Sequence, residues 1–347
     1  MATVDLTVRG AGIFGLSIAW EAARRGARVR VVDPAGPGAG ASGGVVGALA
    51  PHTPDGWNAK KQFQLESLLI SGDFWAELDS ESGISAGYGR TGRLQALADD
   101  AAVALARSRE AAAAENWKGA AAWRVVPAVG AGPWAPASPS GFLLHDTLSA
   151  RLHPRRAIES AASAIRARGG EVVDEARDEG AVVWATGWQG LAALSEALGR
   201  PVGGGVKGQA VLVRAAAPAA APQLLVDGLH IVPHTDGTVA VGSTSEANFD
   251  NPASTDAQVE DLLERALAAL PILHGAPIVL RWAGVRPRAR SRGPILGPWP
   301  DRPGHFVANG GFKIGFGIAA RTAQVMVDLI LEGSDAIPDP FRIENSV

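Results

Sequence analysis

A glycine-rich turn between an apolar strand and a helical segment lies near the start of the chain. Residues 4–8 are mostly apolar and β-branched, and residues 10–15 follow with the spacing G-x-G-x-x-G. Apolar side chains then recur at three- and four-residue steps through residues 16–25, which predicts an amphipathic helix. A second apolar strand over residues 28–32 ends at Asp33. This order of elements predicts a βαβ unit of the Rossmann type.

The glycines and the acid of this unit have separate roles in binding a dinucleotide. Gly10 permits the tight turn, Gly12 lets the backbone approach a pyrophosphate, and Gly15 lets the helix pack closely on the strand. The amides and the positive dipole end at the helix start attract phosphate. Asp33 can accept hydrogen bonds from an adenosine ribose. A glycine-rich turn without a ligand is the alternative in a chain with 43 glycines, but the complete βαβ frame favours the dinucleotide.

Charge and cysteine content exclude several classes of function. The 347 residues suffice for one large or two modest domains, and the net charge of −3 leaves no basic footprint for nucleic acid or an anionic membrane. The absence of cysteine excludes disulfides and thiolate chemistry, and the seven histidines show no close ligand pair. We therefore expect a cytoplasmic protein without a metal site, a signal peptide or a membrane span.

A long loop of small residues follows the second strand. Residues 34–49 are mostly glycine and alanine, whereas a domain that binds NAD alone would be expected to enter a helix soon after this strand. The loop suits close passage along a large cofactor, with Ser42 and Gly43 near a pyrophosphate and residues 47–49 under a ring system. A flexible surface loop is the alternative.

These motifs resemble those of the D-amino-acid oxidase family of FAD-dependent oxidoreductases, which includes glycine oxidase and sarcosine oxidase. The βαβ unit is followed by Gly-Ala-Ser-Gly at residues 40–43 and by Gly-Ala-Leu-Ala-Pro at residues 47–51. Near the other end, residues 281–287 carry the W-A-G-x-R-P pattern, and a P-x-x-G turn follows at residues 294–297. A glycine-rich loop over residues 306–317 then opens a helix. The resemblance covers almost the whole chain.

The resemblance implies an α/β fold with two domains. A Rossmann-like FAD-binding domain of the GR2 type is expected to be discontinuous, made of residues 1–80, 142–213 and 276–347. A second α+β domain, built on an antiparallel sheet and binding the substrate, is expected from residues 81–141 and 214–275.

The remaining elements are predicted from hydrophobic periodicity and turn residues. An Asp-Gly pair predicts a β-hairpin over residues 230–244. His145 and His153 precede a predicted helix, where capping or surface roles are expected. Helices are expected over residues 60–78, 99–114, 155–168, 255–270 and 318–331. Strands are expected over residues 171–173, 181–188, 206–212 and 281–287, and a loop over residues 126–141.

The resemblance implies FAD as the cofactor. Non-covalent binding is expected, because the chain has no cysteine and has glycine rather than histidine after Ser42. The expected FAD contacts are Gly10, Gly12, Ile13, Phe14, Gly15, Asp33, Pro34, Ser42, Gly43, Gly47, Ala48, Leu49, Val172, Val173, Ala185, Thr186, Gly187, Trp188, Gly310, Gly311, Phe312, Lys313, Ile314 and Gly315.

The expected substrate contacts come from separate parts of the chain. Arg286 matches the family's carboxylate-binding arginine, and a planar guanidinium can bind a carboxylate through two parallel charge-assisted hydrogen bonds. An arginine before a proline can instead be a structural ion-pair partner. Lys313 resembles the lysine of sarcosine oxidases that assists carboxylate binding, and His230 stands where glycine oxidases have a tyrosine. These three are the catalytic candidates, and Ser245 and His52 complete the expected substrate site.

The activity implied by the resemblance is oxidative deamination of a small amino acid or secondary amine, of the glycine, sarcosine or D-amino-acid type. A hydride would pass from the substrate Cα to flavin N5, and oxygen would reoxidise the flavin to give hydrogen peroxide. The loop over residues 310–317 would stabilise negative charge on the reduced flavin. His230, His234 and His52 are candidates for handling the amine proton.

Three alternatives stay open. The chain could be an amino-acid dehydrogenase that passes electrons to a quinone or carrier, or a flavin subunit of a hetero-oligomeric amine oxidase or dehydrogenase. A nicotinamide-dependent dehydrogenase is disfavoured by the loop of small residues and by the carboxy-terminal motifs. A homo-oligomer is expected because many family members form dimers or tetramers. The departures from the family pattern at His230, Ser245 and Lys313 leave the identity of the amine open.

Overall fold

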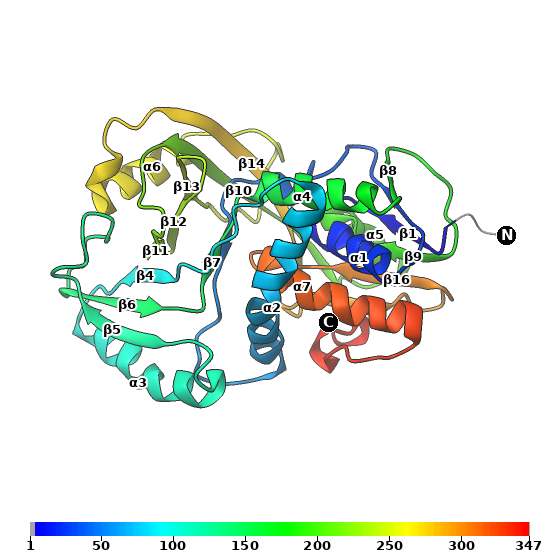
Figure 1. The fold of residues 1–347 in the computed structure, drawn as a ribbon, viewed down its shortest axis with the longest axis horizontal. Coiled ribbons are helices and arrows are strands. Elements are labelled where there is room, and N and C mark those ends of the chain that lie inside the picture. The colour runs from blue at the N-terminus through cyan, green and yellow to red at the C-terminus, as the bar shows by residue number, and fades with distance from the viewer. Residues whose placement is uncertain (1–3, 347) are drawn as a thin grey trace.

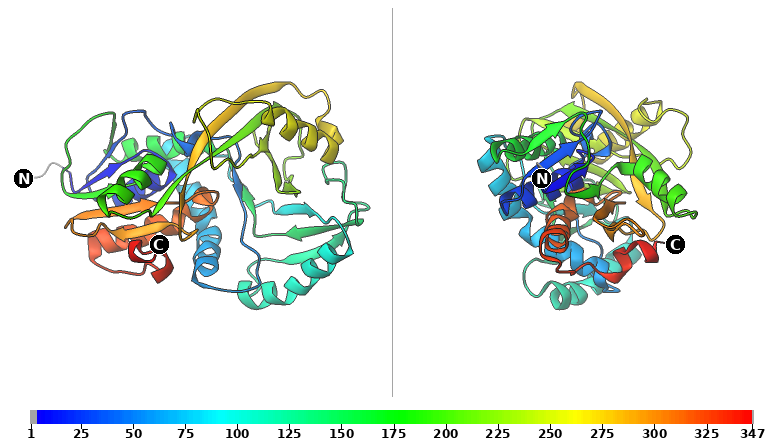
Figure 2. Two further views of the ribbon diagram at one scale, coloured as in Figure 1. Left: turned by 180° about the vertical axis from the view of Figure 1, so that it is seen from behind. Right: turned by 90° about the vertical axis from the view of Figure 1, so that its right-hand side faces the viewer.

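A computed structural model describes residues 4–346 and contains two large sheets with helices packed against them (Figure 1). Residues 1–3 and residue 347, which fall within the predicted FAD-binding domain, lie outside the described residues. The two sheets lie mainly in opposite halves of the molecule in Figure 1 and in the left view of Figure 2, where the long axis is horizontal. The predicted α/β class with a second, largely antiparallel sheet is confirmed.

The six-stranded sheet contains the βαβ unit predicted at the start of the chain. Its order is β15-β16-β9-β1-β2-β8, and all neighbours are parallel except β15 and β16. Parallel strands joined through helices bury both faces of such a sheet. The strands are β1 (Leu6–Arg9), β2 (Val29–Val32), β8 (Glu171–Val173), β9 (Ala181–Trp184), β15 (Ile295–Pro298) and β16 (His305–Asn309).

The eight-stranded sheet has the order β14-β10-β13-β12-β11-β4-β6-β5 and is antiparallel except between β11 and β4. The Asp-Gly hairpin is confirmed as β12 and β13. A third, two-stranded sheet pairs β3 with β7. The strands are β3 (Ala48–Leu49), β4 (Arg93–Ala96), β5 (Trp123–Pro127), β6 (Phe142–Asp146), β7 (Ala150–Arg151), β10 (Gly203–Arg214), β11 (Gln223–Val226), β12 (Leu229–Pro233), β13 (Thr238–Gly242) and β14 (Ile278–Ala289).

Among the described residues, every helix except one begins and ends near the predicted residues, and local caps explain several of the bounds. The exception is α5 (Gly187–Ala197), which was not predicted. Asn58 accepts a hydrogen bond from the Lys61 amide at the start of α2, and the left-handed Gly83 ends this helix. Helix α7 continues into a short π-helical turn, η3 (Asp328–Glu332), before Gly333. The helices are α1 (Ile13–Arg24), α2 (Ala59–Ser82), α3 (Asp100–Trp117), α4 (Pro154–Ala167), α5 (Gly187–Ala197), α6 (Gln258–Ala269) and α7 (Gly315–Val327), with 3₁₀ turns η1 (Ala41–Gly43), η2 (Pro271–Leu273), η4 (Asp339–Phe341) and η5 (Ile343–Asn345).

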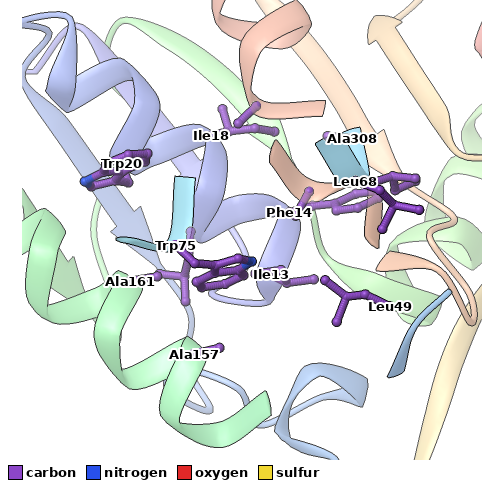
Figure 3. Packing of buried hydrophobic residues seen from close by; sticks show 14 of the residues in the cluster. Ile13, Phe14, Ile18, Trp20, Leu49, Leu68, Trp75, Ala157, Ala161 and Ala308 are labelled. Carbon is purple, nitrogen blue, oxygen red and sulfur yellow. The ribbon is translucent and has the colours of Figure 1, made fainter. Parts of the chain in front are cut away.

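The largest hydrophobic core holds the glycine turn in place. Helices α1, α2, α4 and α7 pack together beside the six-stranded sheet, and Figure 3 shows Trp20 and Trp75 among smaller side chains of this core. Trp20 is edge-to-face with Phe74 at a centroid distance of 5.1 Å. Burial of each large apolar side chain contributes roughly 1.5–3 kcal/mol. The start of α1 is therefore set on a rigid support.

The predicted domain boundaries and the predicted loop over residues 126–141 can be compared with the strands of the eight-stranded sheet. Strands β6 and β14, and all of β10 except its last residue, Arg214, fall within residue ranges predicted for the FAD-binding domain. These strands nevertheless hydrogen-bond into the eight-stranded sheet. β10 and β14 each extend over 12 residues and pair along almost their full length. The domain boundaries stay a prediction, but these strands connect the two halves. Strand β5 also extends into the start of the region 126–141 predicted as a loop.

Within residues 4–346, no helix combines the length and apolarity needed to cross a bilayer. The same residues contain no group of three or more histidine and acidic side chains placed to hold a metal ion.

Candidate active site

One cavity of about 780 Å³ lies between the two large sheets and is lined by residues from both. The carboxyl ends of β1, β2 and β9 open onto it, which is the edge where open α/β sheets bind ligands. The predicted residues that line it are Gly10, Gly12, Ile13, Phe14, Asp33, Pro34, Ser42, Ala48, Leu49, His52, Ala185, Thr186, Gly187, Trp188, His230, Arg286, Gly310, Gly311, Phe312, Lys313, Ile314 and Gly315.

Three predicted glycine contacts lie behind this lining. A Cβ at Gly15 would lie 1.9 Å from the carbonyl oxygen of Gly10, and one at Gly47 would lie 1.8 Å from that of Leu152. A Cβ at Gly43 would also meet backbone, at 2.1 Å. These glycines permit close backbone contacts that shape the wall of the cavity.

Three other predicted residues are also outside the lining. Val172 and Val173 lie in β8 beside β2, where the carbonyl of Val173 accepts a hydrogen bond from the Asp33 amide at 3.0 Å. Ser245 is exposed, and the serine that lines the cavity is Ser243. Sequence reasoning missed Ser243 because nothing local in Ser-Thr-Ser shows which hydroxyl faces inward.

Asp33, predicted beside the adenosine ribose, and Ser42, predicted beside the pyrophosphate, both accept hydrogen bonds from the glycine turn and the start of α1. Asp33 Oδ2 accepts from the Ala11 amide at 2.8 Å, and its Oδ1 accepts from the Ala35 amide at 3.0 Å. Ser42 Oγ accepts from the Ile13 amide at 3.0 Å. Asp33 therefore fixes the glycine turn as well as facing the cavity, and Ser42 ties the loop of small residues to the first turn of α1.

Asn309 is a lining residue that the sequence did not single out. Its Nδ2 donates to the carbonyl of Gly187 at 2.9 Å, and its Oδ1 accepts from the Gly310 amide at 2.8 Å. It thus joins the loop after β9 to the loop before α7. An asparagine before two glycines is a turn signal, but its partner across the site comes from a distant part of the chain.

Arg286 lines the cavity from β14 of the eight-stranded sheet and is only 8% exposed. Its Nη1 donates to Ser243 Oγ at 2.7 Å, and its Nη2 donates to the carbonyls of Thr244 at 2.7 Å and Lys207 at 3.3 Å. Burial lowers the pKa of this guanidinium to about 10, which keeps it charged at neutral pH. To bind a carboxylate through both Nη atoms, Arg286 must give up one of the two hydrogen bonds that Nη2 donates to backbone carbonyls.

Lys313 is a second cation in the cavity lining and lies near Arg286. Its Nζ lies 5.8 Å from the ring centroid of Phe312, and the Arg286 guanidinium carbon lies 5.6 Å from the same centroid. Burial lowers the Lys313 pKa, and the positive charges of Arg286 and Arg288 lower it further. An anion placed between Lys313 and Arg286 would relieve this repulsion.

The three predicted histidines differ in their surroundings. Burial, with Arg93 and Lys313 nearby, lowers the His230 pKa to about 4, so its ring is neutral at pH 7. His52 lines the cavity, and its ring contacts the amide oxygen of Gln64, whose Nε2 donates to the Ala50 carbonyl at 2.9 Å. His234 is not in the lining and instead bonds through Nδ1 to Thr238 Oγ1 at 3.0 Å.

His153 was expected to cap a helix or lie at the surface. It occupies the N-cap position of α4 without a side-chain hydrogen bond to that helix. It is buried, and its ring lies 4.4 Å, centroid to centroid, from that of His234.

Buried histidines predict a loss of stability in acid. Burial lowers the pKa of His230 to about 4 and that of His234 to about 3, from 6.5. Between pH 6.5 and 4 the unfolded chain therefore binds more protons than the folded one. The free energy of unfolding should fall with decreasing pH across this window, by up to about 1.4 kcal/mol per pH unit for each histidine.

Urea unfolding at pH 7 and pH 5 would measure this effect. His234→Asn should reduce the difference in the free energy of unfolding between pH 7 and pH 5. The same change at the exposed His274 should leave this difference as in the parent. If the difference in the free energy of unfolding is unchanged in His234→Asn, buried His234 does not contribute to the loss of stability in acid.

A largely parallel sheet with a glycine turn at its ligand edge, facing a second sheet across a cavity, is the architecture of a dinucleotide-binding protein. The chain belongs to the DAO family of FAD dependent oxidoreductases, whose family model matches residues 5–329. The family assignment suggested by the motifs is confirmed.

Individual relatives share the fold or parts of the sequence. Glycine oxidase from Pseudomonas putida is 37% identical over 136 residues, which cover 39% of this chain and 37% of that protein. The bifunctional protein ThiO/ThiG from Nostoc is 28% identical over 99% of this chain and 55% of its own length. The matched region therefore spans 37% of the length of the first relative and 55% of the length of the second. The crystal structure of glycine oxidase from Geobacillus kaustophilus superposes with a TM-score of 0.84 at 23% identity, covering 99% of each chain.

The residues of the cavity fit FAD, the cofactor that membership of this family implies. The first residues of two helices, Ile13 of α1 and Gly315 of α7, line the same cavity. Helix N-termini favour anionic groups, and FAD has a pyrophosphate and an electron-accepting pyrimidine edge. A Cβ at Gly311 would lie 2.8 Å from the Phe14 ring, so the cavity wall is closely packed there.

Proposed function

We propose that this chain catalyses FAD-dependent oxidative deamination of a small amino acid or secondary amine that carries a carboxylate. The observation that carries the proposal is the pair of cations in the lining of the cofactor cavity. Arg286 bonds to a hydroxyl and to carbonyls, and the charged groups acting on Lys313 are themselves positive. Both cations are therefore available to a carboxylate ligand. Similarity to glycine oxidase supports this class of substrate.

The chain's own residues would orient the substrate. Arg286 and Lys313 would hold the carboxylate, so that the amine and Cα occupy the cavity that would hold the cofactor. FAD, when bound, supplies the redox chemistry by accepting the hydride from Cα and passing electrons to oxygen. The start of α7 and the loop before it, residues 310–315, offer amides where negative charge develops.

The neutral histidines suit proton handling at the amine. His230 is uncharged at neutral pH and lines the cavity, so it can accept a hydrogen bond from a substrate amine. His52 lines the cavity, and its ring contacts the amide oxygen of Gln64. His234 is not among the lining residues and bonds through Nδ1 to Thr238 Oγ1, so we propose His230 and His52 rather than His234 for this role.

Anaerobic mixing of the yellow holoprotein with amines would test the proposal. Glycine, sarcosine, D-alanine, D-proline and larger N-substituted amino acids form the panel, and bleaching of the flavin band is the measurement. At least one member should bleach the band, while methylamine, which lacks a carboxylate, should not. A purified protein without flavin bands, or one that only dithionite reduces, would contradict the proposal.

Admitting oxygen afterwards separates the proposed oxidase from the alternative acceptors. Prompt reoxidation with release of hydrogen peroxide supports oxygen as the acceptor. Slow reoxidation that a quinone accelerates would instead indicate a dehydrogenase. Bleaching only after a second subunit is added would indicate a flavin subunit of a larger complex.

Three finer features belong to the same proposal. FAD is bound non-covalently, so acid precipitation should release all flavin into the supernatant. The protein acts in the cytoplasm on a small-molecule substrate without nucleic acid. It forms a homo-oligomer, which gel filtration of the holoprotein would detect.

Gly208→Ala should weaken carboxylate binding without removing FAD. A Cβ at residue 208 would lie 2.2 Å from Arg286 Nη2 and 2.5 Å from its guanidinium carbon, so the guanidinium must leave its present hydrogen bonds. We expect the dissociation constant of acetate, measured from its perturbation of the flavin spectrum, to rise roughly 10- to 100-fold. Gly204→Ala on the same strand is the control, because its Cβ would meet no atom within 4 Å. Equal acetate binding by both variants would count against Arg286 as the carboxylate anchor.

A further inference from the structure

The Arg286 guanidinium is held by a short segment after β13. Ser243 and Thr244 of this segment accept two of its hydrogen bonds, and Lys207 on β10 accepts the third. Because these acceptors are uncharged, they fix the direction of the guanidinium without neutralising it. The geometry of Arg286 therefore depends on what holds residues 243–246 against β10.

Glu246 is the residue on which this segment converges. Its backbone exchanges two hydrogen bonds of 2.9 Å with the backbone of Lys207. Its carboxylate accepts from the hydroxyl of Thr244 and from Gln209 Nε2, the latter at 3.2 and 3.3 Å. The Thr244 hydroxyl in turn accepts a hydrogen bond from the backbone N–H of Gln209 at 2.8 Å. One carboxylate thus orders both Thr244 and Gln209 beside Arg286.

The same carboxylate compensates buried positive charge. Lys207 Nζ lies 3.7 Å from Glu246 Oε2, and their side chains are 5% and 15% exposed. Arg286 is buried nearby, and Glu246 is the acid whose charge favours its protonated form. Removing one partner of a buried ion pair leaves an uncompensated charge, which is more harmful than removing both. Loss of Glu246 would leave two buried cations close together.

We infer that Glu246, paired with Lys207, is the positioning residue that sets Arg286 for carboxylate binding. The inference rests on the proposed function of Arg286. Glu246 acts through two routes, which are the hydrogen bonds that order residues 243–246 and the negative charge that offsets Lys207. It is not among the residues that line the cavity, so we place it outside direct contact with substrate or cofactor. Its effect is therefore confined to ligands that use the carboxylate anchor.

Glu246→Gln is the sharpest variant, because it keeps the shape of the side chain and removes its charge. The glutamine NH₂ would also face the donors Thr244 Oγ1 and Gln209 Nε2 in one of its two orientations. We expect the dissociation constant of acetate to rise 10-fold or more, and the KM of an amino-acid substrate to rise by a similar factor. The rate of flavin reduction at saturating substrate should change less than threefold.

Glu260→Gln is the matched control. Glu260 is an exposed acid that pairs with Arg281 on the same strand as Arg286, at 2.7 Å. This variant should bind acetate as the parent does. Flavin content and thermal midpoint are measured for both variants, so that a loss of folding is distinguished from a loss of binding.

A double variant, Lys207→Met with Glu246→Gln, covers the case in which the single change unfolds the protein. It removes the buried lysine together with its partner charge, and it should fold while still binding acetate at least 10-fold more weakly than the parent. The inference is overturned if a folded variant, either the single or the double one, binds acetate as tightly as the parent. A lower thermal midpoint in that variant would not change this conclusion. A parent protein that binds no acetate and is reduced by no amino acid would instead overturn the proposed function, and the inference with it.

Discussion

Replacing Arg286 by methionine is expected to lower kcat/KM for the amino-acid substrate roughly 100- to 1000-fold, which corresponds to about 3–4 kcal/mol of lost stabilisation. Methionine fills a similar volume but offers no donor and no charge. The guanidinium is buried and carries hydrogen bonds to Ser243 and Thr244, so its orientation is already established before a ligand binds. Such preorganised donors lose little entropy on binding.

Steady-state kinetics and acetate titration of the flavin spectrum would measure this loss. Arg281→Met is the control, because Arg281 lies on the same strand but is exposed and pairs with Glu260. The control should keep the parent kcat/KM. If Arg286→Met retains acetate binding, the carboxylate is held elsewhere, and Lys313 becomes the first residue to test.

Gly10→Ala is expected to produce the second large effect, a loss of FAD and of roughly 2–4 kcal/mol of stability. Gly10 has a φ of +105°, which residues with a side chain rarely adopt. A Cβ there would also lie 2.4 Å from the carbonyl oxygen of Ala185, which follows β9. Relief of this contact requires β1 and β9 to separate where they open onto the cavity.

Urea unfolding and the flavin-to-protein ratio would measure both consequences. Gly204→Ala serves again as the control, because it adds the same methyl group where no atom lies within 4 Å. Gly10→Ala protein that retains a full complement of FAD and the parent stability would show that the turn can rearrange. In that case the glycine would not be required for close backbone approach at this end of the site.

The parts of the fold that were predictable are those whose physical causes are local. The helix α1 follows from apolar spacing and the β12–β13 hairpin from an Asp-Gly turn, and both are confirmed within a few residues. The predicted βαβ unit also brings Asp33 to the glycine turn, because a strand, a short helix and a parallel strand leave few ways to connect. Motif order then pointed to the family that its model confirms.

Residues near the substrate end were harder to assign from sequence. Ser245 was expected in the site, but Ser243 lines the cavity, because the orientation of residues 243–246 depends on pairing with β10. Glu246 carried no motif at all, and its importance emerges only from its contacts with Lys207 and Gln209. Contacts of this kind join residues distant in sequence, and no periodicity reports them.

The sequence by itself determined the class of this protein: a βαβ unit with a glycine turn, a loop of small residues, and an arginine before a proline in a late strand. These features are readable because turn geometry and strand or helix spacing depend on neighbouring residues. Only the tertiary structure decided how Arg286 is presented, since its guanidinium bonds to Lys207, Ser243 and Thr244. The strength of buried charges depends on which groups surround them, and folding alone brings those groups together.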